Sequence, residues 1–250
     1  MQEKFGEKGL TVLGVTDEPQ KLTEDWVEKK GAKYAYAYDK GGKLARFFGV
    51  SGIPHAVLVD ASGKIVWRGH PGNLKDDDIE KAVKGALSKP MWEWPASAKA
   101  VRTAVQKRQW ADAIAAASKL PEADGGPVIA DALKQLVTGR VTAMKEDLNA
   151  GNFLGAQDAA TALSKSLGSL PEKAEADAVL TAIKADKDAA KIIKAQQQIR
   201  GIREAAPSKR KEIDAAIEDL KKLAKEHPGT YAATEANALL DELVGKKRNQ

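Results

Sequence analysis

Histidine and cysteine, two residue types that commonly carry catalysis or bind metals, are scarce in this sequence. The 250 residues include three histidines, His55, His70 and His227, and no cysteine. Without cysteine, these residues supply no disulfide, no thiolate nucleophile, no cysteine-ligated zinc and no dithiol redox couple. His55, His70 and Asp60 lack the spacing of known metal ligands, and no Gly-x-Ser-x-Gly, P-loop or dinucleotide-binding motif occurs. We therefore predict no catalytic residue, no metal site and no cofactor.

Positive and negative charges are close to balance and are mixed along the chain. There are 40 Lys and Arg against 35 Asp and Glu, which gives a net charge of +5. The densest basic region, 184–211, is interleaved with acidic residues, as is typical of a solvated helix surface, so we predict no nucleic-acid partner. No apolar run approaches the roughly 20 residues that cross a bilayer. The charged start of the sequence, MQEKFGEKGL, leads us to expect no signal peptide.

Composition divides the sequence near residue 90. Most of the aromatic residues, glycine-bearing turns and β-branched runs precede this point, and alanine-rich segments follow it. We predict an α/β domain over 1–89, a linker over 90–96 and a helical domain over 97–250. Trp92 and Trp94 of the linker are predicted to form a hydrophobic seam between the domains. An exposed aromatic binding patch is the alternative.

Alternating element types would position the motifs of the first domain. Short apolar, β-branched or strictly alternating segments predict strands over 11–16, 34–38, 56–60 and 64–68. Apolar residues at helical spacing predict helices over about 19–30, 42–48 and 75–87. This alternation predicts an α/β layer architecture.

The second domain is predicted to be all-α. Helices are expected over about 96–107, 109–119, 127–150, 152–167, 172–205, 209–226 and 230–244. Some pieces resemble tetratricopeptide-type hairpins, but no period of roughly 34 residues is present, and the segment 172–205 is too long for a standard repeat. We interpret this domain as a degenerate helical repeat or an irregular bundle. Such surfaces commonly bind peptides or proteins, and a purely scaffolding role is the alternative.

Four segments of the first domain carry a resemblance to a known family. They are Glu7-Lys-Gly-Leu-Thr-Val-Leu-Gly-Val-Thr16, Phe48-Gly-Val-Ser-Gly-Ile-Pro-His55, Val57-Leu-Val-Asp-Ala-Ser-Gly-Lys-Ile-Val66 and Trp67-Arg-Gly-His-Pro-Gly72. The Gly-Ile-Pro followed by an apolar strand, Asp, a turn and Gly-Lys-Ile is the most specific part. Residues 1 to about 88 thus resemble the C-terminal two-thirds of a thioredoxin-like domain. The closer resemblance is to the TlpA-like thiol–disulfide oxidoreductases, which are relatives of the peroxiredoxins.

The resemblance implies a cis peptide bond before Pro54. In that family this proline presents the backbone of the preceding residue to an extended substrate segment, which would make Ile53, Pro54 and His55 a peptide platform. The family's Cys-x-x-Cys motif and central strand would lie upstream of Met1. We therefore expect an N-terminally truncated thioredoxin-like domain, in which the strand between 11–16 and 56–60 is missing.

Three explanations of the missing strand are open at the level of sequence. The first is that the sequence comes from a truncated gene model or is a proteolytic fragment of a longer protein. The second is that the two flanking strands pair directly, and the third is that a strand from a second copy or a partner fills the gap. Each unpaired strand edge would favour strand addition, and hence a homo-oligomer in the second-copy case.

Two functions follow as hypotheses. The first is a thioredoxin-fold protein-interaction module that has a protein or peptide partner and no redox activity of its own. The alternative is the C-terminal portion of a TlpA-like thiol–disulfide oxidoreductase whose Cys-x-x-Cys motif precedes Met1. The resemblance implies an extracytoplasmic setting, although the lack of cysteine also permits the cytoplasm.

Overall fold

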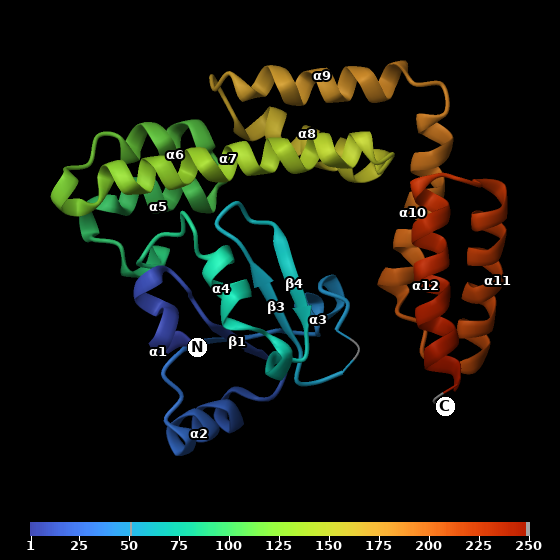
Figure 1. The fold of residues 1–250 in the computed structure, drawn as a ribbon, viewed down its shortest axis with the longest axis horizontal. Coiled ribbons are helices and arrows are strands. Elements are labelled where there is room, and N and C mark those ends of the chain that lie inside the picture. The colour runs from blue at the N-terminus through green and yellow to red at the C-terminus, as the bar shows by residue number, and fades with distance from the viewer. Residues whose placement is uncertain (51, 249–250) are drawn as a thin grey trace. The chain divides into compact units, whose positions relative to one another are not determined.

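The computed structural model describes residues 1–50 and 52–248 and divides into two compact units, Met1–Arg140 and Val141–Gln250 (Figure 1). The division falls inside one long helix, α7 (Gly126–Asn149). The domain limits 1–89, 90–96 and 97–250 are expected from a change in composition and not from contacts between residues. They stay a prediction.

The first unit alternates short strands and helices before it becomes wholly helical. Its strands are β1 (Leu13–Thr16), β2 (Ala35–Tyr38), β3 (Ala56–Val59) and β4 (Ile65–Gly69). Its helices are α1 (Gln2–Phe5), α2 (Gln20–Lys30), α3 (Lys43–Phe47), α4 (Asp76–Ala82), α5 (Lys99–Gln106), α6 (Trp110–Ala117) and the first part of α7. Single 3₁₀ turns occur at Gly6–Lys8 (η1), Pro71–Asn73 (η2), Met91–Glu93 (η3), Ala96–Ala98 (η4) and Glu122–Asp124 (η5). The expected α/β order is therefore present, with α4 ending earlier than predicted.

The four strands form two separate sheets among the described residues. Strand β1 pairs with β2 in parallel, with Leu13 opposite Ala35 and Thr16 opposite Tyr38. Strand β3 pairs with β4 in an antiparallel hairpin, with Ala56 opposite Gly69. An irregularity after Leu58 skips one residue of β4. The described strands thus form no continuous four-stranded sheet.

Phe5 is the centre of the small core of the α/β part. Its side chain is fully buried and packs with Leu58 of β3 and with Ile79 and Ala82 of α4. Burying a phenylalanine side chain contributes about 1.5–3 kcal/mol. Lys4 forms an ion pair with Asp76, and Lys8 forms another with Glu80 at 3.1 Å. The apolar contact, flanked by these two exposed ion pairs, holds α1 against α4 and β3.

A glycine allows helix α7 to approach the hairpin turn of the first unit. A Cβ atom added at Gly139 would lie 2.4 Å from Cβ of Ser62, which is closer than two carbon atoms can pack. Ser62 belongs to the turn between β3 and β4, where its hydroxyl donates to the Asp60 carboxylate at 2.6 Å. The absence of a side chain at Gly139 therefore decides how closely α7 covers this turn.

The second unit is built from helices that pair with their neighbours in sequence. They are the end of α7, α8 (Phe153–Ser166), α9 (Glu172–Ala185), α10 (Ala189–Ala205), α11 (Arg210–Glu226) and α12 (Tyr231–Arg248). Helices α10, α11 and α12 lie side by side (Figure 1) and enclose an apolar core that includes Ile199, Ile213, Leu220 and Leu239. None of the helices in the described ranges combines the length and apolar character that crossing a bilayer demands.

The single long helix predicted over 172–205 is wrong. The structure has two helices there, α9 and α10, separated by Asp186, Lys187 and Asp188. The Asp186 carboxylate accepts hydrogen bonds from the backbone N–H groups of Asp188 (2.8 Å) and Ala189 (3.0 Å). These bonds satisfy donors at the start of α10, which has no preceding turn to pair with. Neither proline nor glycine occurs between α9 and α10, so the sequence contains no helix-breaking residue at this point.

We expect Gln196→Leu to lower the free energy of unfolding of the second unit by about 2–3 kcal/mol. Gln196 of α10 is 2% exposed, and its side-chain oxygen accepts from the backbone N–H of Leu154 at 2.9 Å. Its amide nitrogen also donates to the Gly151 carbonyl at 3.3 Å. Leucine fills similar volume but leaves these buried groups unpaired. Urea denaturation measures the loss, and the exposed neighbour Gln197→Leu serves as the control, with a change within about 0.5 kcal/mol.

Candidate functional site

The loop between α3 and β3 presents the residues that the sequence singles out. The Ile53–Pro54 peptide bond is cis, the isomer that the resemblance implies. The Ile53 side chain is 92% exposed, and Gly52 and Pro54 are exposed as well. An isoleucine so fully in water is available for contact with another molecule. The loop therefore offers an exposed apolar side chain at the start of β3.

Asp39 fixes the helix that leads into this loop. It directly follows β2, is 5% exposed, and accepts the backbone N–H groups of Leu44 and Ala45 at 3.0 Å each. These two hydrogen bonds hold the pKa of the Asp39 carboxyl below its usual value. The carboxylate thereby satisfies donors in the first turn of α3. Helix α3 ends at Phe47, which is 77% exposed and lies edge-on to Phe48 with ring centroids 5.0 Å apart.

The three histidines lie in different settings. His55 is partly buried at the start of β3, and its Nε2 atom is buried without a hydrogen-bond partner. His70 precedes η2, and its Nδ1 atom accepts from the backbone N–H of Gly72 at 3.1 Å. His227 is buried at the end of α11. Within residues 1–50 and 52–248, no group of three or more His, Asp or Glu side chains is arranged to hold a metal ion.

One edge of β1 carries backbone groups that face away from β2. The Asp39 N–H donates to the Thr16 carbonyl at 2.7 Å, so the backbone groups of Thr16 face β2. Backbone groups of successive residues point to opposite sides of a strand. Gly14 therefore also faces β2, whereas Leu13 and Val15 direct their N–H and C=O groups to the other side. The side chains of Leu13 and Val15 are about half exposed as well.

Strand β3 has an equivalent open edge. The Asp60 N–H donates to the Lys64 carbonyl at 2.9 Å, which places the backbone groups of Asp60, and hence of Leu58, on the β4 side. Val57 and Val59 then direct their backbone groups away from the hairpin. The described residues provide no third strand for either sheet. Direct pairing of β1 with β3, one of the three explanations open at the level of sequence, is thus contradicted, because among the described residues each strand pairs only with its neighbour in sequence.

The two linker tryptophans have different surroundings in the first unit. Trp94 is partly buried, and its indole N–H donates to the Lys89 carbonyl at 3.2 Å. Arg102 of α5 donates to the Trp94 carbonyl at 2.8 Å. Trp92 is 59% exposed and lines a cavity. Whether both residues also form the predicted seam between domains stays a prediction.

Sequence comparison agrees with this arrangement of elements. Residues 1–68 match the AhpC/TSA family. The chain is also similar to thiol–disulfide oxidoreductases named ResA. The ResA of Bacillus thuringiensis strain Al Hakam is 34% identical over 64 residues, which is 25% of this chain and 37% of that protein. The ResA of Halalkalibacterium halodurans is 25% identical over 88 residues, or 35% of this chain and 48% of that protein.

The AhpC/TSA match covers only part of this chain, and the ResA matches cover only part of this chain and of each relative. A third relative, the ResA of Bacillus thuringiensis subsp. konkukian, is 31% identical over 82 residues, which covers 47% of its length. The chain therefore spans less than half the length of the curated relatives it matches. No solved structure gives a significant match to the chain. The comparisons thus support a thioredoxin-like α/β part and a relationship to thiol–disulfide oxidoreductases, and the structure shows a large additional helical part.

The sequence analysis predicted the Ile53–Pro54 loop, but it did not single out Asp39 and Phe47, which precede this loop in the chain. Ile53, Pro54 and His55 occur together at the start of β3, as expected. Asp39 was not singled out, although an aspartate followed by Gly41, Gly42 and a helical segment is a recognisable helix-start pattern. Phe47 was taken only as part of a helix, because its exposure depends on what packs around it.

We expect Asp39→Asn to lower the midpoint of thermal unfolding by roughly 2–4 °C, because the charge-assisted bonds to Leu44 and Ala45 become weaker. The folded-state pKa of Asp39 is depressed, so its stabilisation is present above the unfolded pKa of about 3.9 and is lost as pH falls through the lower folded value. Calorimetric melts at pH 7 and near pH 3 measure both effects. The exposed Asp25→Asn is the control, and an equal shift for both variants would contradict this role.

Proposed function

We propose that this chain is a protein-interaction module of thioredoxin-like ancestry that binds an extended polypeptide segment beside the Ile53–Pro54 loop. The observation that carries the proposal is the pair of open strand edges on β1 and β3. Such edges bind partners by adding a strand, in which backbone hydrogen bonds give affinity and side-chain contacts give selectivity. The partner is thus a segment in the β-conformation with apolar side chains.

The side chains beside these edges support an apolar partner. Leu13 and Val15 on β1 and Val59 on β3 are between 46% and 50% exposed. Ile53, shortly before β3, and Phe47, at the end of α3, are two further exposed apolar side chains. An extended segment that paired with either edge would remove part of this apolar surface from water, which is favourable. Both hydrogen bonding and burial therefore favour the same class of occupant.

The module would recognise its partner without exchanging disulfides through its own residues. Thiol–disulfide exchange begins with attack by a thiolate, and the 250 residues contain no cysteine. The loop that the resemblance assigns to substrate positioning is nevertheless present, with its cis proline. We therefore separate substrate positioning from thiol–disulfide exchange. The Ile53–Pro54 loop binds an extended segment, and any thiol chemistry needs cysteines outside these 250 residues.

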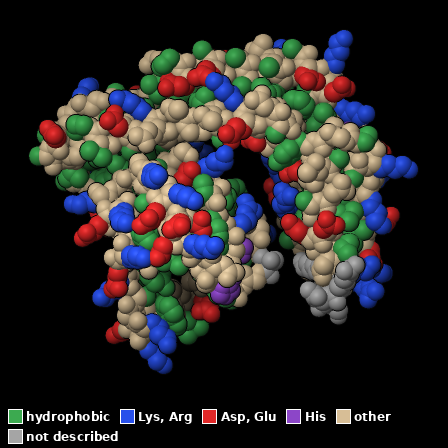
Figure 2. Space-filling model, viewed as in Figure 1, with side chains coloured by type: hydrophobic (Ala, Val, Ile, Leu, Met, Phe, Trp, Pro, Cys, Tyr) green, Lys and Arg blue, Asp and Glu red, His purple; other side chains and the backbone are tan. Residues whose placement is uncertain are grey.

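We also propose that the helical part is a degenerate helical repeat that contributes a second protein-binding surface. In support, α5 with α6, α8 with α9 and α11 with α12 each pack as neighbouring helices. Acidic and basic side chains are interspersed on the face that Figure 2 shows. A mixed surface of this kind suits a polar protein partner.

The test of strand addition is amide hydrogen exchange followed by NMR, with a peptide of alternating valine and threonine capped by lysines. In the chain alone, we expect the amides of Leu13, Val15, Val57 and Val59 to exchange faster than those of Gly14 and Leu58. Bound peptide should slow exchange at one or both open edges by at least roughly tenfold, because the amides gain hydrogen bonds. The matched control is the same peptide N-methylated at alternate residues, which removes its donors.

Two variants test whether the peptide binds at the Ile53–Pro54 loop or at any exposed apolar side chain. Ile53→Asp should weaken peptide binding about fivefold or more, because it places a charge beside the apolar segment. Leu22→Asp, at an exposed leucine of α2, should leave binding unchanged. Slow exchange of the four edge amides in the free chain, or equal binding of the N-methylated peptide, would overturn the proposal.

A second candidate function is the C-terminal portion of a thiol–disulfide oxidoreductase whose Cys-x-x-Cys motif precedes Met1. The gap between β1 and β3 and the similarity to ResA proteins favour it, and the resemblance to TlpA-like proteins would then place the parent outside the cytoplasm. Intact mass and N-terminal peptide sequencing of the native protein test it. A mass well above 26.7 kDa with a cysteine-bearing peptide upstream would support the enzyme. A mass of 26.7 kDa would exclude it.

A further inference from the structure

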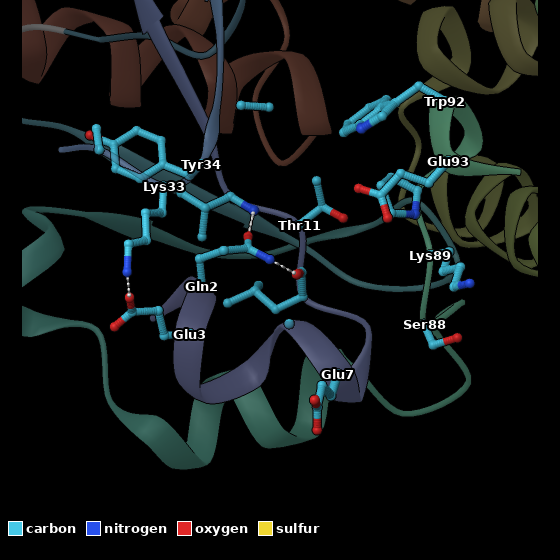
Figure 3. Close-up of a pocket in the computed structure, with 16 residues that line it drawn as sticks. Gln2, Glu3, Glu7, Thr11, Lys33, Tyr34, Ser88, Lys89, Trp92 and Glu93 are labelled. Carbon is cyan, nitrogen blue, oxygen red and sulfur yellow. Dashed lines mark hydrogen bonds and ion pairs between the residues drawn. The ribbon is translucent and has the colours of Figure 1, made fainter. Parts of the chain in front are cut away.

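A cavity of about 570 Å³ lies in the first unit, away from the Ile53–Pro54 loop in sequence. One wall is α1 with η1, another is formed by residues 10–12 before β1 and residues 32–35 at the start of β2, and the third is the segment 88–93 (Figure 3). Its volume falls within the range of roughly 300–1,000 Å³ that is typical of ligand sites. We call it the Trp92 cavity. Neither the comparisons nor the sequence motifs assign it a role.

On the floor of the Trp92 cavity, the side-chain amide of Gln2 already has hydrogen-bond partners. The side chain of Gln2 accepts from the backbone N–H of Val12 at 2.7 Å and donates to the Leu10 carbonyl at 3.1 Å. The side-chain amide of Gln2 thus pairs with backbone groups of the segment before β1, as the backbone of a neighbouring strand would. The remaining floor includes the apolar side chains of Leu10 and Val12. A ligand therefore finds its specific polar partners on the rim of the cavity.

The rim combines an exposed aromatic ring with an unpaired carboxylate. Trp92 is 59% exposed, and Figure 3 shows Glu93 beside it with its carboxylate directed toward the cavity. No ion pair involving Glu93 occurs among the described residues. Lys33, on the opposite side, is paired with Glu3 at 3.2 Å, and Lys89 points away from the Trp92 ring in this view. The local charge next to Trp92 is therefore negative.

An aromatic face beside a carboxylate is a recognition site for an organic cation. The face of a tryptophan ring attracts cations, and a planar guanidinium stacks on it while it also hydrogen-bonds a carboxylate. A lysine ammonium can do the first but lacks the planar fork. We propose that the Trp92 cavity binds an arginine side chain of a partner peptide or protein, stacked on Trp92 and paired with Glu93. This proposal stands independently of strand addition at β1 and β3.

The experiment titrates the full chain with the capped tripeptide acetyl-Ala-Arg-Ala-amide and follows by NMR the indole N–H signal of Trp92 and the backbone amide signals of Lys89 and Glu93, which the Trp92→Ala variant retains. The indole signal is assigned by its loss in Trp92→Phe. We expect a Kd of about 1–10 mM, as befits one exposed side-chain contact. The matched peptide with glutamine in place of arginine should bind at least roughly fivefold more weakly, because it lacks the charge. A tripeptide is too short to add a strand, so the result does not depend on the proposed function.

Two variants and two controls locate the site. Trp92→Ala and Glu93→Gln should each weaken binding about three- to fivefold, and raising salt from about 50 to about 500 mM should weaken it further. Trp26→Ala and Glu28→Gln, at an exposed tryptophan and glutamate of α2, should change nothing. Circular dichroism confirms that each variant is folded. Equal affinity for the arginine and glutamine peptides, or unchanged binding by Trp92→Ala, would overturn the proposal.

Discussion

The need of every strand to pair its backbone polar groups is the constraint on which the rest of this structure depends. Strands β1 and β3 each meet that need on one side only, through β2 and β4 respectively. The N–H and C=O groups of Leu13, Val15, Val57 and Val59 face outward as a consequence of the ladder pattern. Such edges are open to another chain, and natural proteins usually cover or interrupt them. The functional proposal follows from this one incomplete pairing.

Apolar burial, rather than sheet continuity, holds the α/β part together. Phe5 connects α1 to β3 and α4, and the ion pairs of Lys4 and Lys8 lie on the outside of this contact. Exposed ion pairs contribute little, so the buried ring is the main anchor. Strands β1 and β2 have no residue among the buried apolar core, which fits a sheet whose inner neighbour is not provided by the described residues. The two sheets therefore keep separate, weakly covered edges.

The proposed function separates binding of a partner from thiol–disulfide chemistry. The Ile53–Pro54 loop, the exposed Phe47 and the open strand edges concern how an extended segment would bind. The thiolate that performs exchange in thiol–disulfide oxidoreductases is a different group, and none occurs in the 250 residues. The Trp92 cavity adds a surface of another character, with an aromatic ring and a carboxylate in place of an apolar edge. Both surfaces suit polypeptide partners, through backbone pairing in one case and a charged side chain in the other.

The sequence by itself determined most of the strands and helices, the proline loop before β3 and the absence of cysteine from these residues. Those features are local: apolar periodicity, a Gly-Ile-Pro motif and a residue count. Only the tertiary structure decided that 172–205 is two helices, because Asp186 caps the start of α10 without any proline or glycine to announce the break. It also decided that β1 and β3 do not pair and that Trp92 and Glu93 share the rim of a cavity with residues of α1. Each of these depends on groups distant in sequence or on competition between local hydrogen bonds, and periodicity does not report either.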